Sequence, residues 1–157
     1  MTACTVYASP AGDILIAEED GAITLVGFLK QEAPLEASEP PTPLLAETVR
    51  QLREYFAGAR REFDLPLRLR GTPYQKAVWK ELCAIPYGET RSYADIAAAV
   101  GNGRACRAVG MANNRNPVSI IVPCHRVIGK NGSLTGYGGG LDKKEFLLSL
   151  EQRYSRR

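Results

Sequence analysis

The chain has 157 residues, 45% hydrophobic and 24% charged, which is enough to bury the core of one domain or of two small ones. No apolar run approaches the ~20 residues of a membrane-spanning helix, and the N-terminus lacks a secretory pattern, so we expect a cytoplasmic protein with no membrane partner. Four scattered cysteines and one histidine argue against a disulfide framework or a zinc site, and we expect neither metal nor cofactor.

The charge is unevenly divided along the chain. Residues 1–65 carry five basic and eleven acidic side chains, a net charge of −6, whereas residues 66–157 carry fifteen and six, a net charge of +9. The second half is therefore the part expected to meet a polyanion. Charge alone is weak support, because many basic surfaces are only solvated.

The N-terminal part of the chain predicts a small sheet and one helix. Three short strand candidates, separated by turn residues, predict a meander at 4–8, 13–17 and 22–29. Pro43 is typical of a first helical position, and the amphipathic pattern that follows it ends at Gly58. Residues 63–70 alternate apolar and polar side chains, as an extended edge segment does. No catalytic constellation occurs in this part.

The pattern then becomes mostly helical. Thr72 begins one helix with a capping box, and Ser92 caps a second, short helix that ends at Gly101. A third helical pattern covers residues 104–113, with alanines on one face and arginines on the other. Two short helices joined by a turn indicate a helix-turn-helix, although a plain helical hairpin with solvated arginines fits this segment equally well.

A thiol and the only histidine stand side by side after an apolar run. Residues 118–122 predict a buried strand, and Pro123 interrupts it so that Cys124 leaves the strand in a rigid geometry. Cysteine acts as a nucleophile when a neighbouring base generates its thiolate. Adjacent side chains on extended backbone point to opposite faces, so either a turn brings the thiol and the His125 imidazole together or a water bridges them.

The last helical pattern begins with a capping box at Asp142. Its apolar stripe consists of Phe146, Leu147, Leu150 and Tyr154. Glu151 lies at the margin of that stripe, so it is either a surface carboxylate or the third member of a cysteine, base and carboxylate arrangement. A packed cysteine beside a satisfied histidine is the plainer alternative to a catalytic pair, and only the wider sequence context overturns it.

That context extends from residue 71 to residue 151. The run NPVSIIVPCHRVIG and the upstream segment TPYQKAVWKELCAIPYGETRSYADIAAAVGNGRACRAVGMANNRNP closely resemble the active-site region of the O6-alkylguanine-DNA alkyltransferases. The resemblance implies an α+β fold, with a small ribonuclease H-like α/β domain over residues 1–70. A mostly helical, winged-helix-like domain with a helix-turn-helix would then cover residues 71–157.

The same resemblance implies a function. It implies direct-reversal DNA repair, by a single irreversible transfer of the alkyl group from O6-alkylguanine, and also from O4-alkylthymine, to Cys124. The implied partner is double-stranded DNA with the damaged base flipped out, bound by a monomer. The small residues of the recognition helix, which is the helical pattern over residues 104–113, favour the minor groove, where readout is degenerate and any sequence can be scanned.

Roles for individual residues also follow from the resemblance. His125 is implied as a base that acts through water, Glu151 as its partner, and Asn116 as the link between the recognition helix and the active-site loop. The residues implied at the DNA are Tyr93, Arg107, Arg115 and Arg126. The residues implied around the flipped base are Tyr93, Val127, Tyr137 and Gly138.

Three rival functions are less consistent with these residues. A relative that binds alkylated guanine without repairing it would lack Cys124. A cysteine-histidine hydrolase would leave the helix-turn-helix segment and its arginines unexplained. An alkylation-sensing regulator would carry extra domains, for which we expect no room in 157 residues.

Overall fold

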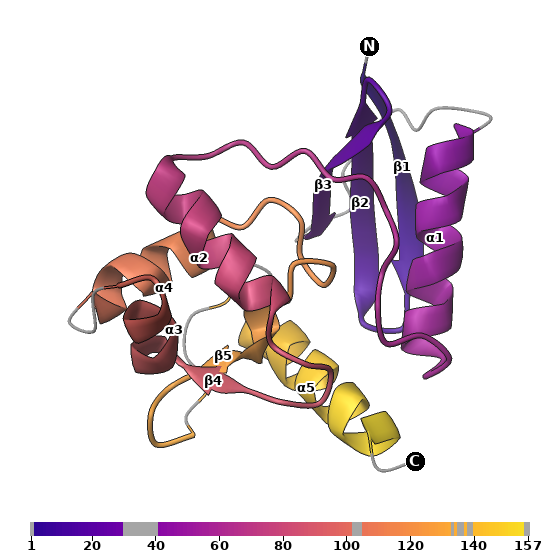
Figure 1. Cartoon of the computed structure of the whole chain (residues 1–157). Coiled ribbons are helices and arrows are strands. Elements are labelled where there is room, and N and C mark those ends of the chain that lie inside the picture. Colours follow the sequence, from indigo (N-terminus) through magenta and orange to yellow (C-terminus); the bar gives the residue numbers. More distant parts are fainter. Residues whose placement is uncertain are drawn as a thin grey trace.

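The computed structural model describes residues 2–29, 41–101, 105–132, 134, 137 and 140–155. An N-terminal sheet with one helix stands beside a helical C-terminal part (Figure 1), so the expected α+β class is confirmed. Within the described ranges, none of the helices has the length and apolar character needed to span a bilayer. The turn expected at residues 101–103 lies largely outside these ranges.

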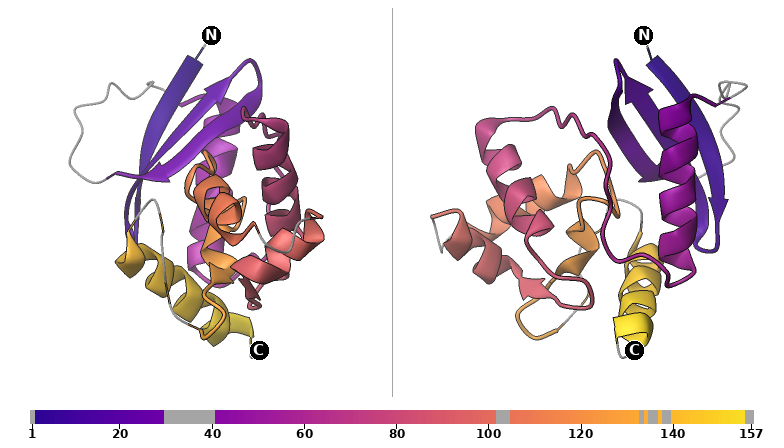
Figure 2. Two further views of the ribbon diagram at one scale, coloured as in Figure 1. Left: turned by 90° about the vertical axis from the view of Figure 1, so that its left-hand side faces the viewer. Right: turned by 45° about the vertical axis from the view of Figure 1, so that its right-hand side comes forward.

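The N-terminal part is the predicted meander with a helix packed on it. The strands β1 (Thr2–Ser9), β2 (Gly12–Glu19) and β3 (Ala22–Phe28) pair antiparallel in that order. Helix α1 (Pro43–Phe56) begins at Thr42, whose hydroxyl accepts the backbone N–H of Leu45 at 3.1 Å. Figure 2 shows α1 along one face of the sheet.

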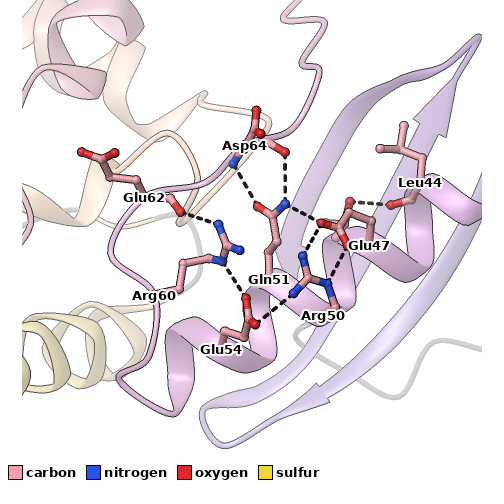
Figure 3. Close-up of polar contacts among 9 residues, drawn as sticks. Leu44, Glu47, Arg50, Gln51, Glu54, Arg60, Glu62 and Asp64 are labelled. Atoms are coloured by element: carbon pink, nitrogen blue, oxygen red, sulfur yellow. Dashed lines mark hydrogen bonds and ion pairs between the residues drawn. The ribbon is translucent and has the colours of Figure 1, made fainter.

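The buried face of α1 differs from its apolar pattern. Tyr55 is fully buried and Gln51 is 2% exposed, whereas Val49, which the apolar spacing favours, is only half-buried. Gln51 explains part of this difference. Its side-chain amide donates to the backbone carbonyl of Asp64 at 3.0 Å and accepts the backbone N–H of Asp64 at 2.9 Å (Figure 3). Helix α1 thereby holds the segment that leads to the C-terminal part.

The C-terminal end of α1 lies against the last helix, α5 (Leu141–Ser155), as Figure 2 shows. The rings of Phe56 and Phe146 are 6.3 Å apart. Gly58, just past the end of α1, has a φ of +77°, and the ring of Tyr154 occupies the space that a side chain at Gly58 would need. The two helices come from opposite ends of the sequence, yet they form one interface.

Three helices make up the core of the C-terminal part: α2 (Pro73–Cys83), α3 (Tyr93–Ala99) and α4 (Cys106–Asn114). The capping box predicted at Thr72 and the cap predicted at Ser92 both form, because each hydroxyl accepts a backbone N–H three residues on. The side chains of Gln75 and Asp95 accept the backbone N–H of Thr72 and Ser92 in return, so Ser92 also begins a capping box. Buried Trp79 of α2 donates its indole N–H to the carbonyl of Ala112 in α4 at 2.8 Å. This bond fixes α4 against α2.

A short parallel pair closes the C-terminal part. Strand β4 (Arg91–Ser92) pairs with β5 (Val127–Ile128), which directly follows the 3₁₀ turn η1 (Cys124–Arg126). The start of α3 is therefore adjacent to the segment that carries the thiol.

The prediction of a strand over residues 118–122 is wrong. Val118 makes a single bridge to Val26 of β3, and the chain then turns back so that the N–H of Val122 donates to the carbonyl of Val118 at 3.0 Å. Ile120 has a φ of +73° at the centre of a three-residue turn, a conformation that costs a β-branched residue roughly 1–3 kcal/mol. Full burial of these apolar side chains offsets that cost, so the apolar run marks burial and not extension.

Candidate active site

The thiol lies on a tight turn, not at the end of a strand. The N–H of Cys124 donates to the carbonyl of Val122 at 2.8 Å, and the N–H of Arg126 donates to the carbonyl of Pro123 at 3.0 Å. Cys124 is 4% exposed and His125 is fully buried. The turn is one of the two geometries that the sequence left open, but in it Nδ1 of His125 has no hydrogen-bond partner among the described residues.

Two amides at the end of α4 hold this turn. Asn116 donates from Nδ2 to the carbonyl of Val122 at 2.8 Å, and its Oδ1 accepts the N–H of Val118 at 3.0 Å. Asn113 donates from Nδ2 to the carbonyl of Cys124 at 3.2 Å. Sequence reasoning identified Asn116 but missed Asn113, whose signal was an amide on the otherwise apolar inner face of α4.

His125 and Glu151 form a buried pair. Nε2 of the imidazole lies 2.6 Å from Oε2 of the carboxylate, and the two side chains are 0% and 1% exposed. Burial lowers the pKa of His125 against the opposing attraction of Glu151, so the imidazole is neutral at neutral pH. Since a carboxylate only accepts, the proton belongs on Nε2. Nδ1 is then free to take a proton.

Glu151 is surrounded by donors from several elements. Arg126 donates from Nε to Oε1 at 2.8 Å and from Nη2 to Oε2 at 3.0 Å. The hydroxyl of Tyr55 donates to Oε2 at 2.7 Å, and the N–H of Gly88 donates to Oε1 at 3.3 Å. Burial alone would raise the pKa of Glu151, but His125 and Arg126 together hold that pKa well below the ordinary value. The group is therefore a carboxylate at neutral pH.

Arg126 is not where its expected role at the DNA requires it to be. The side chain is buried, and Nη1 donates to the carbonyl of Ile85 at 2.7 Å while the other nitrogens bind Glu151. A buried carboxylate needs a buried cation, and because the Arg126 guanidinium fills that role it is not available to bind a phosphate of DNA. The assignment of Arg126 to the DNA interface is corrected accordingly.

A second buried cation, Lys144, was missed. Lys144, Leu147 and Glu151 form the buried face of α5, whereas Phe146 of the predicted stripe is 36% exposed. The ammonium of Lys144 lies 5.8 Å from the ring centre of Tyr93. Burial lowers the pKa of Lys144 to about 8, and the charge of the Cys124 thiolate acts against that shift. The spacing of Lys144 and Glu151, two helical turns apart, was the available signal.

The surroundings of the thiol favour its protonated form at rest. Burial raises the pKa of Cys124, and the opposing effects of Asn116, Lys144, Tyr137 and Ser119 do not cancel that increase. A cavity of about 210 Å³ reaches Cys124. Asn113, Asn116 and Ser119 are among the residues that line it. A base is therefore needed to make the nucleophile.

None of the remaining predicted residues that the structure describes is among those that line this cavity. Tyr93, at the start of α3, is half-buried, whereas Val127 and Tyr137 are buried beside the Cys124 turn. Burial, and next the Cys124 charge, raise the pKa of Tyr137. Arg107 on α4 and Arg115, the residue after its end, are exposed, with Met111 between them 61% exposed. Gly138 lies outside the described residues, and within those residues no group of His, Cys, Asp and Glu could hold a metal ion.

Two family models match this chain. One describes the ribonuclease-like domain of 6-O-methylguanine DNA methyltransferase and matches residues 2–69, and the other describes its DNA binding domain and matches residues 73–153. The chain is 54% identical over 156 residues to a constitutive methylated-DNA–protein-cysteine methyltransferase of Bacillus subtilis, and the match covers 94% of each chain.

Solved structures agree with these matches. The crystal structure of the Mycobacterium tuberculosis O6-methylguanine methyltransferase is 47% identical, with a TM-score of 0.87 over 98% of this chain and 94% of that one. A crystal structure of Mycobacterium tuberculosis OGT in complex with DNA is 49% identical, with a TM-score of 0.86 over 95% and 92% of the two chains.

Proposed function

This chain belongs to the 6-O-methylguanine DNA methyltransferase family, and from that premise we propose that Cys124 is the residue that accepts the alkyl group. The activity of the family, which is the activity of this chain, is repair of DNA by transfer of an alkyl group to a protein cysteine. One observation carries the assignment to Cys124. The buried thiol is followed by a neutral imidazole whose Nδ1, which has no hydrogen-bond partner among the described residues, can take a proton while Nε2 is held by Glu151.

The transfer is an in-line displacement at the alkyl carbon. The thiol proton passes through a water to Nδ1 of His125, and the Glu151 carboxylate stabilises the imidazolium that forms. A bond from sulfur to the alkyl carbon forms as the bond from that carbon to O6 breaks, and its electron pair stays with guanine, which then takes up a proton. The product thioether has no easy route back to a thiolate, so each protein acts once.

Lys144 stabilises the thiolate in this scheme. A buried ammonium that interacts with the Cys124 charge favours the ionised sulfur, which burial otherwise disfavours. Asn113 and Asn116 position the sulfur by holding the backbone on both sides of it. We infer that the flipped base contacts Tyr93, Val127 and Tyr137; the resemblance adds Gly138, which lies outside the described residues.

Helix α4 carries the DNA interface. A base inside a duplex cannot present O6 to sulfur, so it is extruded at a cost of a few kcal/mol, and Arg107 fills the space that it leaves. Arg115 contacts the phosphate backbone. Small residues such as Ala108 and Gly110 let α4 enter the minor groove closely. In support, the half of the chain that contains α4 has a net charge of +9.

The proposal also covers the domain boundary, the oligomeric state, the location in the cell and a second substrate. The boundary between the two domains falls between residues 70 and 71, the protein acts as a monomer in the cytoplasm, and O4-alkylthymine is a second substrate.

The mass of the protein tests the acceptor. Incubation with a duplex containing O6-methylguanine is expected to add one methyl mass, and no more than one per protein, to the peptide that bears Cys124. The exposed cysteines Cys83 and Cys106 are internal controls and stay unmodified. Cys124→Ala is expected to abolish transfer and keep DNA binding. An unchanged mass of the wild-type protein after excess substrate refutes the proposal.

A pair of arginine variants tests the DNA interface. Arg107→Ala is expected to slow repair in duplex DNA more than reaction with free O6-benzylguanine, because only the duplex requires base extrusion. Arg126→Gln is expected to lower stability, because it leaves the Glu151 carboxylate without its cation, but to leave the affinity of the folded protein for undamaged duplex unchanged, because this side chain is committed to Glu151. Equal losses with both substrates in Arg107→Ala contradict the extrusion role.

A further inference from the structure

One donor to the Glu151 carboxylate comes from the N-terminal part. Tyr55, on α1, is fully buried, and its hydroxyl lies 2.7 Å from Oε2 of Glu151, 96 residues further along the chain. Oε2 is also the oxygen that contacts Nε2 of His125 at 2.6 Å and Nη2 of Arg126 at 3.0 Å. Three donors from two segments, α1 and η1, therefore meet at one oxygen atom.

The position of this hydroxyl is set by the N-terminal part itself. The ring of Tyr55 packs edge-on to Phe56 at 5.3 Å and lies 5.6 Å from the ring of Phe63. Phe63 is in turn fixed because Gln51, one helical turn before Tyr55, binds the backbone of Asp64 in both directions. The tyrosine thus reaches the carboxylate from a rigid support.

The Tyr55 hydroxyl weakens the attraction of the Glu151 carboxylate for a second proton on His125. A hydrogen bond to Oε2 spreads part of its negative charge onto Tyr55, so less is available to hold a second proton on the imidazole. The same bond fixes Oε2 opposite Nε2. Both effects keep Nδ1 of His125 unprotonated and correctly aimed.

Taken with the proposed role of Cys124, on which it rests, this geometry leads us to propose that Tyr55 is a positioning residue for alkyl transfer. Its hydroxyl orients the Glu151 carboxylate and limits protonation of His125, and by this route the N-terminal part takes part in the reaction. Tyr55 does not touch the reacting atoms.

The chain offers a matched control. Tyr87 lies beside the same pair, with its ring 6.3 Å from that of Tyr55, but its hydroxyl has no hydrogen-bond partner among the described residues. The other charged or titratable groups near the Glu151–His125 pair are Arg126, Lys144, Cys124 and Tyr137. Neither Tyr55→Phe nor Tyr87→Phe alters these groups, so the two variants differ in one hydrogen bond.

The single histidine makes the test direct. In protein labelled with ¹⁵N-histidine, the spectrum reports His125 alone, because the sequence has no other histidine. Tyr55→Phe is expected to raise the titration midpoint of His125 and to lower the single-turnover rate of transfer from an O6-methylguanine duplex about tenfold at neutral pH, an effect of the size that the loss of one hydrogen bond to a charged group produces. Tyr87→Phe is expected to leave both unchanged. Thermal unfolding and binding to undamaged duplex check that both variants are folded.

A double variant gives a second criterion. In a Glu151→Gln background, Tyr55→Phe is expected to cause no further loss of rate, because the hydroxyl acts only through the carboxylate. Additive losses, an unchanged midpoint and rate in Tyr55→Phe, or equal changes in Tyr87→Phe overturn the inference. If the wild-type protein gains no methyl mass in the same assay, the proposed role of Cys124 fails instead, so the two failures are distinguishable.

Discussion

Two networks of charged side chains in this molecule have similar distances and opposite surroundings. On α1, Arg50 donates to Glu47 at 2.6 Å and to Glu54 at 2.9 Å (Figure 3), and these side chains are 51%, 38% and 36% exposed. In the active site, Arg126 donates to Glu151 at 2.8 Å, and these side chains are 8% and 1% exposed. Water replaces a lost partner in the first network but not in the second. Burial, not distance, decides which network matters.

The pKa of the carboxyls does not separate the two networks. Hydrogen bonds from Arg50 and Gln51 lower the pKa of Glu47 to about 2, and the pKa of Glu151 is also low. Of the two carboxyls, only Glu151 has a low pKa although it is buried. The difference between the networks is therefore best measured as the effect of removing one partner.

Removal of the Glu151 charge is expected to have the largest effect. Glu151→Gln leaves Arg126 as a buried cation without a carboxylate, and breaking such a pair costs about 3–5 kcal/mol of unfolding free energy. Alkyl transfer slows as well, because His125 loses the group that stabilises its protonated form. Urea unfolding at pH 7 measures the first effect and single-turnover kinetics the second. Stability equal to that of the wild type would remove the distinction between the networks.

Acidification acts on the buried network as a whole. The folded-state pKa values of His125 and Glu151 both lie below those of the unfolded chain, so the unfolded chain binds more protons as the pH falls, and the free energy of unfolding decreases. The contribution of His125 is complete above about pH 6.5 and is lost as the pH falls through its lower folded pKa. Urea unfolding from pH 7 to 5 measures this loss, and His125→Gln is expected to flatten that part of the profile. A flat wild-type profile contradicts a neutral buried imidazole.

Gln51 lies on α1, like the exposed network, but its side chain is buried, like those of the active-site network. Gln51→Ala is expected to reduce the free energy of unfolding by about 1–3 kcal/mol, since it leaves the N–H and the carbonyl of Asp64 without their partner. Urea unfolding measures the change. No change would mean that residues 60–64 rearrange freely and that α1 does not hold them.

The smallest effect is expected on the exposed face of α1. Glu47→Gln removes a carboxylate whose partner Arg50 remains hydrated and can still bind Glu54. The thermal unfolding midpoint and the rate of alkyl transfer are both expected to equal those of the wild type within error. A clear loss of stability would show that the exposed network does more than its surroundings indicate.

Local signals in the sequence were mostly reliable where one turn of chain determines the outcome, except that α5 begins at Leu141, which places Asp142 inside the helix and not at its cap. Thr72 and Ser92 cap their helices as predicted, because the hydroxyl and the N–H that it accepts are three residues apart. The apolar run at 118–122 was misleading, because burial favours the same side chains in a strand and in a tight turn. The stripe on α5 was misplaced because an apolar pattern cannot show that Lys144 and Glu151 are buried.

The sequence by itself determined the family, the α+β class and the adjacency of Cys124 and His125, since these depend on residue identity and short spacings. Only the tertiary structure decided that Arg126 faces Glu151 and not DNA, that Lys144 lies near the thiol, and that Tyr55 reaches the carboxylate. These contacts join residues that are distant in the chain, and each depends on how α1 and α5 pack. A buried charge takes its partner from whichever element packing brings beside it, and that choice leaves no mark at short range in the sequence.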